Sequence, residues 1–514
     1  MYTRIICIII LSTISLACFP QKKLKQGDQA LAQKQYYQAI IFFTDYIDKK
    51  NINNTNFAEA AFKIGYCYKE LSYPDLAAEY FKQAIEKNYE DPIVYYYYGE
   101  MLQMTQKYEL ALQNYEIFKN LAPNHEFAEK GIESINFTYA SLNNPTRYEV
   151  KIIGALNSGE FDFCPFFEAR NNKKLYFTST RYAPNHITLN SESGDFCSNL
   201  FYSEQNKDGR WSVPALVPGI INTTDEEGAA CLNRKSSNIY FTRCKHEKNI
   251  DKGCRIYVAR KTGSAWGQVQ EVEIRGIPDN ISIGHPAISD DELTLYFVAD
   301  SLLGGYGGKD IFKVVRERKN QPFNLPQNMG PHINTEQDEI HPYIRSNGDL
   351  YFSSNGRTGM GGFDIFCAKH IEGTLYKVEN LGSPLNSSHD DFGIVFMGMR
   401  EEGFLSSWRT GGMGKTDLFH FVLPEIRFTV SGKIWNKNTN EPIPFVDIQI
   451  MNDEYVLMDT QSANESGEYE VDLKPDNNYI IFYKAEGFPI KKAEVNTKNL
   501  TDTKHFTRDI FFEK

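Results

Sequence analysis

The stretch LYFSSNGRTGMGGFDIF, residues 350–366, contains the pattern that decides the fold of this 514-residue chain. Two short apolar runs flank a glycine-rich segment, which predicts two strands joined by a tight hairpin. The first run recurs near positions 175, 239, 295 and 403, and the second near 199, 255, 310 and 417. The second runs begin 56, 55, 54 and 53 residues apart, so this stretch is one of five copies of a repeat of about 55 residues.

Each copy begins with a further short strand, and together the strands predict a propeller blade. The opening strands are CPFF at Cys164, ACLN at Ala230, HPAI at His285, HPYI at His341 and the weaker FGIV at Phe392. Blades bury their faces only against neighbouring blades, so the copies must close into a ring. We therefore predict a five-bladed WD40-like β-propeller over residues 147–424.

A second repeated phrase marks the connection from one blade to the next. Asn-Ser or Asn-Thr precedes acidic residues in LNSGEFD, INTTDEE, INTEQDE and LNSSHDD, whereas the third copy reads IPDNISIG at 277–284. Such side chains fix turns by bonding to nearby backbone groups. The strand-like segment 148–154 has no blade of its own, so we expect it to complete the fifth blade and close the ring.

Residues 18–146 show a helical pattern that repeats every 34 residues after a first, longer copy. The repeated positions are Gly27, Ala39 and Phe43, then Gly65, Ala77 and Phe81, then Gly99, Ala111 and Tyr115. This pattern resembles the tetratricopeptide repeat, in which small residues let paired helices approach and aromatic residues fill the space between pairs. The run YYYY at 95–98 must face several directions, so packing accounts for some rings and a partner-binding groove for others.

The last segment, residues 426–514, predicts a small β-sandwich from short strands separated by Gly, Asn and Pro signals. Its Ser431-Gly432, Glu441-Pro442 and Gly467-Glu468-Tyr469 motifs resemble the carboxypeptidase regulatory-like domain. That resemblance implies a non-catalytic module.

The amino terminus predicts an export signal over residues 1–17, with Arg4 before an apolar stretch that is too short to span a bilayer. Cys18 follows at once, in a segment that resembles the lipobox of bacterial lipoproteins, although Ser15 stands where leucine is usual. We expect lipidation of Cys18, with simple cleavage as the alternative. The resemblance implies attachment to a membrane.

Cysteine spacing and charge limit the chemistry further. Nine cysteines are present, and Cys244 and Cys254, which flank one loop, are the candidate disulfide pair of an exported chain. No Cys-x-x-Cys or paired-His spacing indicates a zinc site. The net charge of −11 argues against nucleic-acid partners, which require clustered Lys and Arg.

One motif imitates a nucleotide site. RTGGMGKTDLF, residues 409–419, contains Gly-Lys-Thr, but its first glycine position is Arg409 and a strand follows in place of a helix. The acidic pairs at 338–339 and 390–391 recur at blade corners, and His285 and His341 occupy matching repeat positions, so all are interpreted as structural. We predict no catalytic, cofactor-binding or metal-binding residues.

The order of these modules resembles PorE-like envelope lipoproteins of Bacteroidota, within the OmpA family, which are associated with type IX secretion and gliding. Such proteins normally continue into a peptidoglycan-binding OmpA-like domain, whereas this sequence ends at Lys514. A naturally shorter chain and an incomplete sequence both remain open, and peptidoglycan binding is in doubt.

The function that these features predict is a non-enzymatic periplasmic scaffold. It would be tethered to the outer membrane, on its periplasmic face, by Cys18 and would bind envelope or secretion-machinery proteins without a cofactor. The alternative is a carbohydrate- or peptide-processing lipoprotein with an active site in the propeller funnel, where activity would depend on Asp338 or His341.

Overall fold

The computed structural model describes residues 22–48, 53–168, 172–247, 250–372 and 375–514. These form two compact units, one that ends at Val422 and one that begins at Leu423. Cys18 and the signal segment lie outside the described residues.

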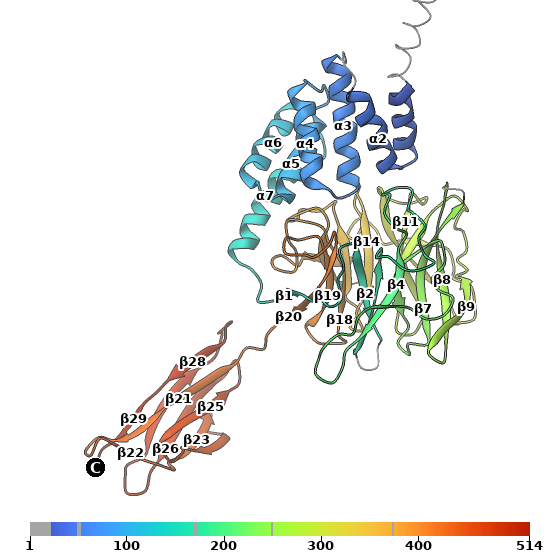
Figure 1. The fold of residues 1–514 in the computed structure, drawn as a ribbon. Helices are drawn as coiled ribbons and strands as arrows, with labels where there is room; N and C mark the ends of the chain where they lie inside the picture. The colour runs from blue at the N-terminus through green and yellow to red at the C-terminus, as the bar shows by residue number, and fades with distance from the viewer. Residues whose placement is uncertain (1–21, 49–52, 169–171, 248–249, 373–374) are drawn as a thin grey trace, which may run out of the picture. The chain divides into compact units, whose positions relative to one another are not determined.

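The first unit opens with a stack of helices (Figure 1). A helix over residues 22–32 is followed by α2 (Tyr36–Ile47), α3 (Asn54–Glu70), α4 (Pro74–Glu86), α5 (Ile93–Met104), α6 (Tyr108–Leu121) and α7 (Phe127–Asn143). Asn53 caps α3 by accepting a hydrogen bond from the Asn56 N–H, and Pro74 begins α4, where its missing N–H is not needed.

Close approach between paired helices depends on the repeated glycines. A Cβ atom at Gly65 would lie 2.8 Å from Cδ1 of Phe81, and one at Gly99 would lie 2.7 Å from Cε1 of Tyr115. Both aromatic rings are buried. The pairing therefore requires the small and aromatic residues that the repeat predicts.

Five four-stranded antiparallel sheets follow. The first three are β2 (Asp162–Phe167), β3 (Lys174–Ser179), β4 (Asn199–Glu204) and β5 (Ala215–Leu216); β6 (Glu226–Leu232), β7 (Asn238–Glu247), β8 (Ile250–Thr262) and β9 (Ala265–Glu271); and β10 (Ile283–Ile288), β11 (Thr294–Asp300), β12 (Lys309–Val315) and β13 (Gln327–Asn328). The last two are β14 (Glu339–Ile344), β15 (Leu350–Ser354), β16 (Asp364–Glu372) and β17 (Leu375–Asn380); and β18 (Asp391–Phe396), β19 (Glu402–Ser407), β20 (Asp417–Val422) and β1 (Glu149–Ile152).

The five sheets are arranged in a ring. The first strand of each sheet contacts the first strand of the next, and β18 contacts β2 to complete the circle. Strand β1 pairs with β20 in antiparallel register, with Glu149 opposite Val422 and Ile152 opposite Phe419. The segment before the first repeat therefore supplies the outer strand of the fifth sheet.

Every first strand has a bulge where it lines the centre of the ring. The bulged residues have positive φ: Cys164 (49°), Ala229 (38°), His285 (51°), His341 (50°) and Gly393 (61°). Three of them donate their backbone N–H to a hydroxyl on the second strand of the preceding sheet, namely Ser406, Thr178 and Thr242. The register shifts at each of these bulges. After the first bulge, Phe166 packs in a cluster with Phe241 of the second sheet and Phe167 packs against Phe404 of the fifth.

Four connections between sheets share one hydrogen-bonded arrangement, which we call the corner. In the fifth sheet the Ser387 N–H and Oγ donate to Oδ2 of Asp391 at 2.6 and 2.7 Å, and Arg409 donates to Oδ1 at 2.5 Å. The Asn386 side chain exchanges hydrogen bonds with the backbone of Ile365. The acids at the other three corners are Asp162, Glu227 and Glu339.

The third corner, which leads into β10, is built differently. Ile283 occupies the position of the acid, and Arg255 from β8 donates to the carbonyl oxygens of Ile281, Pro278 and Asp279. A cation on the preceding sheet therefore holds this turn in place of a buried carboxylate.

Helices and ring contact each other at one end of the ring. Lys130 donates to the Asn355 carbonyl at 2.6 Å, Gln103 donates to that of Met360 at 3.1 Å, and Tyr73 packs edge-on against Trp408. Asn355, Met360 and Trp408 lie in loops that join second to third strands. The turns that join first to second strands lie at the opposite end.

The second unit contains two sheets that share one core. One contains β21 (Phe428–Asn436), β22 (Glu441–Pro442), β25 (Glu468–Leu473), β28 (Lys504–Thr507) and β29 (Ile510–Phe512), and the other β23 (Asp447–Asn452), β24 (Leu457–Ser462), β26 (Asn478–Lys484) and β27 (Lys491–Asn496). Val430, Ile448, Val471 and Ile481, from both sheets, are fully buried in that core.

Candidate functional site

A groove of about 800 Å³ runs between α3, α5 and the turn before α5. We call it the helical groove. Its aromatic side chains are Phe62, Tyr66, Tyr89 and Tyr97. The rings of Phe62 and Tyr89 stack with centroids 4.3 Å apart, and Tyr97 lies 6.1 Å from Tyr66. All four are half-buried, so each presents part of its ring to the groove.

The charges along the helical groove are predominantly acidic. Its only lysine, Lys63, binds Asp28 and Glu59 at 2.7 Å each, so that its charge is already matched. Glu90 and Asp91 also line the groove, are exposed, and form no ion pair with any residue that the structure describes. Burial, followed by the nearby Asp91, raises the pKa of Tyr89 to about 12.

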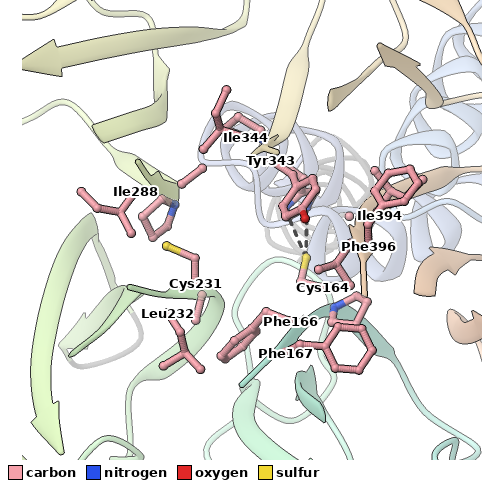
Figure 2. A pocket seen from close by; sticks show the side chains of 18 of the residues that line it. Cys164, Phe166, Phe167, Cys231, Leu232, Ile288, Tyr343, Ile344, Ile394 and Phe396 are labelled. Carbon is pink, nitrogen blue, oxygen red and sulfur yellow. Dashed lines mark hydrogen bonds between the residues drawn. The ribbon is translucent and has the colours of Figure 1, made fainter. Parts of the chain in front are cut away.

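A second cavity, of about 290 Å³, occupies the centre of the ring and is called the ring pocket (Figure 2). All five first strands line it, and its rim residues Asn172, Arg234, Asp290 and Ser346 belong to turns between first and second strands. The ring pocket therefore opens at the end of the ring opposite the helices. Phe166, Phe167, Tyr343 and Phe396 contribute aromatic walls.

The floor of the ring pocket brings together Cys164, His285 and His341. The two imidazoles stack with centroids 3.8 Å apart, and the Cys164 sulfur lies 3.2 Å from His341 Nδ1. Burial lowers the pKa of His285 to about 3 and that of His341 well below its usual value, and it raises that of Cys164. These shifts favour the neutral form of all three groups, whereas nucleophilic catalysis by cysteine uses the thiolate.

The contact between the two histidines was missed by sequence reasoning, although their matching repeat positions were recognised. Equivalent residues of neighbouring sheets face the same centre, so two histidines at one repeat position meet. His285 also has a structural role. The other second strands carry Ser or Thr at one position, where β11 has Val298 and therefore no side-chain hydroxyl. The His341 N–H donates to His285 Nδ1 at 3.3 Å in place of the missing hydroxyl.

The paired acids accept hydrogen bonds in the turns between sheets, as their recurrence at the blade corners predicted. Glu339 accepts hydrogen bonds from Thr335 and Ser354, and Asp391 from Ser387. Asp338 accepts the Lys309 N–H and Asp390 the Phe363 N–H. Asp338 and His341, the residues named for the enzymatic alternative, have different partners.

The Gly-Lys-Thr segment forms a hairpin around an aspartate. The N–H groups of Met413 and Gly414 donate to Oδ2 of Asp417 at 2.7 and 3.1 Å, as those of Met360 and Gly361 do to Asp364. Lys415 pairs with Asp195. These donors are engaged by carboxylates within the chain.

Cys244 and Cys254 are joined by a disulfide between β7 and β8. Within the described ranges no group of three or more His, Cys, Asp or Glu side chains could hold a metal ion. No helix in those ranges is both long and apolar enough to span a membrane.

No protein-family model matches the chain, and no curated protein matches it. Solved structures that resemble its helices are tetratricopeptide-repeat proteins. The first such domain of Spaghetti (RPAP3), bound to an HSP90 peptide, is 21% identical with a TM-score of 0.22, covering 24% of this chain and 93% of that one. MamA is 19% identical with a TM-score of 0.21, covering 23% of this chain and 62% of that one. YrrB is 19% identical with a TM-score of 0.22, covering 25% of this chain and 63% of that one.

Proposed function

We propose that this chain is a non-enzymatic scaffold that binds proteins of the bacterial envelope. In this proposal Cys18 carries a lipid that tethers the chain to the periplasmic face of the outer membrane. The ring of sheets is a five-bladed WD40-like propeller, and the second unit is a carboxypeptidase regulatory-like sandwich. Secretion-machinery proteins of the type IX or gliding kind are the partners that the resemblance to PorE-like proteins suggests.

The observation that carries the proposal is the helical groove. Four partly exposed aromatic rings offer apolar contact area with little conformational entropy to lose, as hot-spot residues of protein interfaces do. Glu90 and Asp91 lack ion-pair partners among the described residues, so they can contribute charge to a bound segment. A groove of about 800 Å³ accommodates several side chains of an extended or helical peptide.

Site-specific photo-crosslinking in the source bacterium tests this proposal. A photoreactive amino acid at Tyr97 should give light-dependent adducts with envelope proteins, and the Phe62→Ala variant should weaken them. The same amino acid at Glu116, an exposed position on α6 outside the groove, is the matched control. Equal adducts at both positions, or none at Tyr97, would contradict a binding groove.

The lipid tether needs a separate test. The Cys18→Ser chain should move from the membrane fraction to the soluble periplasmic fraction, because a lipid chain is the proposed attachment. A wild-type chain found in the cytoplasm would overturn the proposed location but would leave the groove to be judged by crosslinking.

A further inference from the structure

The ring pocket is open at its rim, has aromatic and aliphatic side chains along its walls, and has no charged residue among those that line its floor. Phe166, Phe167, Ile394 and Phe396 are buried side chains that line it, and Tyr343 and Ile344 are half-exposed to it (Figure 2). Among the residues that line the pocket, Arg234 and Asp290 at the rim carry charge; they approach each other to 3.6 Å and remain exposed to solvent. Lys309, which is outside the lining and acts electrostatically on both floor histidines, is paired with Asp338 at 3.3 Å. A ligand that reaches the floor of the pocket therefore gives up part of its hydration and meets no charged side chain there.

Hydrogen bonds at the floor fix the proton positions on the imidazoles. His285 Nδ1 accepts the His341 N–H, so the proton of the neutral His285 ring lies on Nε2. That Nε2–H has no protein partner in the described part of the chain, and His285 lines the pocket. The His341 ring is engaged by the Cys164 thiol. The floor thus offers one uncommitted N–H donor from an uncharged group.

We propose that the ring pocket binds a small uncharged molecule with an apolar body and a hydrogen-bond acceptor, such as an amide, ester or ketone, which receives the His285 Nε2–H. A carboxylate or an ammonium group would lose its hydration without gaining an opposite charge, a loss of several kcal/mol. A hydrocarbon of the same shape would leave the N–H unpaired once water is displaced. The volume of about 290 Å³ accommodates a two-ring body.

Calorimetric titration of the full chain with three probes of matched shape tests the proposal. The probes are 2-naphthamide, 2-naphthoate and 2-methylnaphthalene. We expect the amide to bind roughly tenfold more tightly than the other two, since a factor of ten corresponds to about 1.4 kcal/mol, the size of one net hydrogen bond. No binding by any probe, or equal binding by all three, would overturn the proposal.

Replacing the donor gives the second arm. The His285→Phe change is made together with Val298→Thr, so that a threonine hydroxyl can accept the His341 N–H, as the equivalent hydroxyls do in other sheets. The amide should then bind no better than the hydrocarbon. His420→Phe, at a histidine outside the pocket, should change nothing. An amide affinity that persists in the His285→Phe chain would contradict the assigned donor.

A third variant separates loss of binding from loss of folding. Ile344→Trp enlarges a half-exposed wall residue and should abolish binding of all three probes, while the thermal unfolding transition stays cooperative. Binding that survives this change would place the probes outside the ring pocket.

Discussion

Four corners of the ring rely on a buried carboxylate, whereas the third corner relies on Arg255 from the neighbouring sheet. The carboxylate corners connect the turn to its own strand through Ser or Thr, and three of them add an arginine from the same sheet. At the third corner the guanidinium reaches three backbone carbonyls and Ile283 packs in an apolar cluster. Each carboxylate corner also has an asparagine that donates to a backbone carbonyl of the preceding sheet, so the contrast is between a turn held from both sheets and a turn held by Arg255 across the seam.

The largest effect is expected from copying the third corner onto the fifth. Asp391→Ile would leave the partly buried Arg409 and the Ser387 N–H without their carboxylate, and should lower the free energy of unfolding by about 3 to 5 kcal/mol. Urea unfolding followed by circular dichroism measures this change. A loss below about 1 kcal/mol would show that the corner acid is dispensable.

The fourth corner should respond to pH. Burial raises the pKa of Glu339 to about 7 from 4.5, against the hydrogen bonds from Ser354 and Thr335. Between those pH values the folded chain retains a proton that the unfolded chain releases, so stability is present below pH 4.5 and is lost as pH rises toward 7.

The Glu339→Gln variant lacks this titration. Relative to it, the wild type should lose about 3 kcal/mol of unfolding free energy between acidic and neutral pH, since each pKa unit corresponds to about 1.4 kcal/mol. Urea unfolding of both chains at several pH values provides the measurement. Parallel pH profiles would show that Glu339 does not take up a proton on folding.

Removing Arg255 probes the third corner itself. Arg255→Ala deletes hydrogen bonds from a charged donor to the Ile281, Pro278 and Asp279 carbonyls, and should cost about 2 kcal/mol. The effect is smaller than that of Asp391→Ile because two of the acceptor residues, Pro278 and Asp279, are exposed and their carbonyls can bind water. A loss equal to that of Asp391→Ile would remove the distinction between the two kinds of corner.

The smallest effect is expected where β11 lacks a hydroxyl. Val298→Thr should change stability by less than about 1 kcal/mol, because a new acceptor for the His341 N–H offsets the burial of a hydroxyl. In this background the destabilisation caused by His285→Ala should shrink. A double-mutant cycle with a coupling energy near zero would argue against the acceptor role of His285.

The sequence repeat predicted most strands of the ring, because each strand occupies the same position within every copy of about 55 residues. The pairing of β1 with β20 followed from a strand that had no sheet of its own. The contact of His285 with His341 did not follow, because spacing along the chain does not specify how near to the centre of the ring a side chain lies. Val298, in place of the Ser or Thr of the other second strands, is the sequence feature that indicates a different hydrogen-bond acceptor at this position.

The helical groove shows a different limit. The Gly65 and Phe81 pairing was predictable because it repeats, whereas the run YYYY gave no indication of which ring faces which way. Tyr96 is buried and Tyr97 lines the groove, because successive residues of a helix point about 100° apart. The groove acids Glu90 and Asp91 lie in a turn, where neither period nor repeat constrains their direction.

The pairing of β1 with β20 also determines how the ring would respond to mechanical load. The chain enters β1 at Glu149 and leaves β20 at Val422, and these two residues lie opposite each other in the ladder. Tension applied between the two ends of the protein would therefore pull both strands apart from the same end, so their hydrogen bonds would break one after another. Hydrogen bonds that break one after another resist less force than bonds loaded together, so the fifth sheet is where the ring itself would first begin to open.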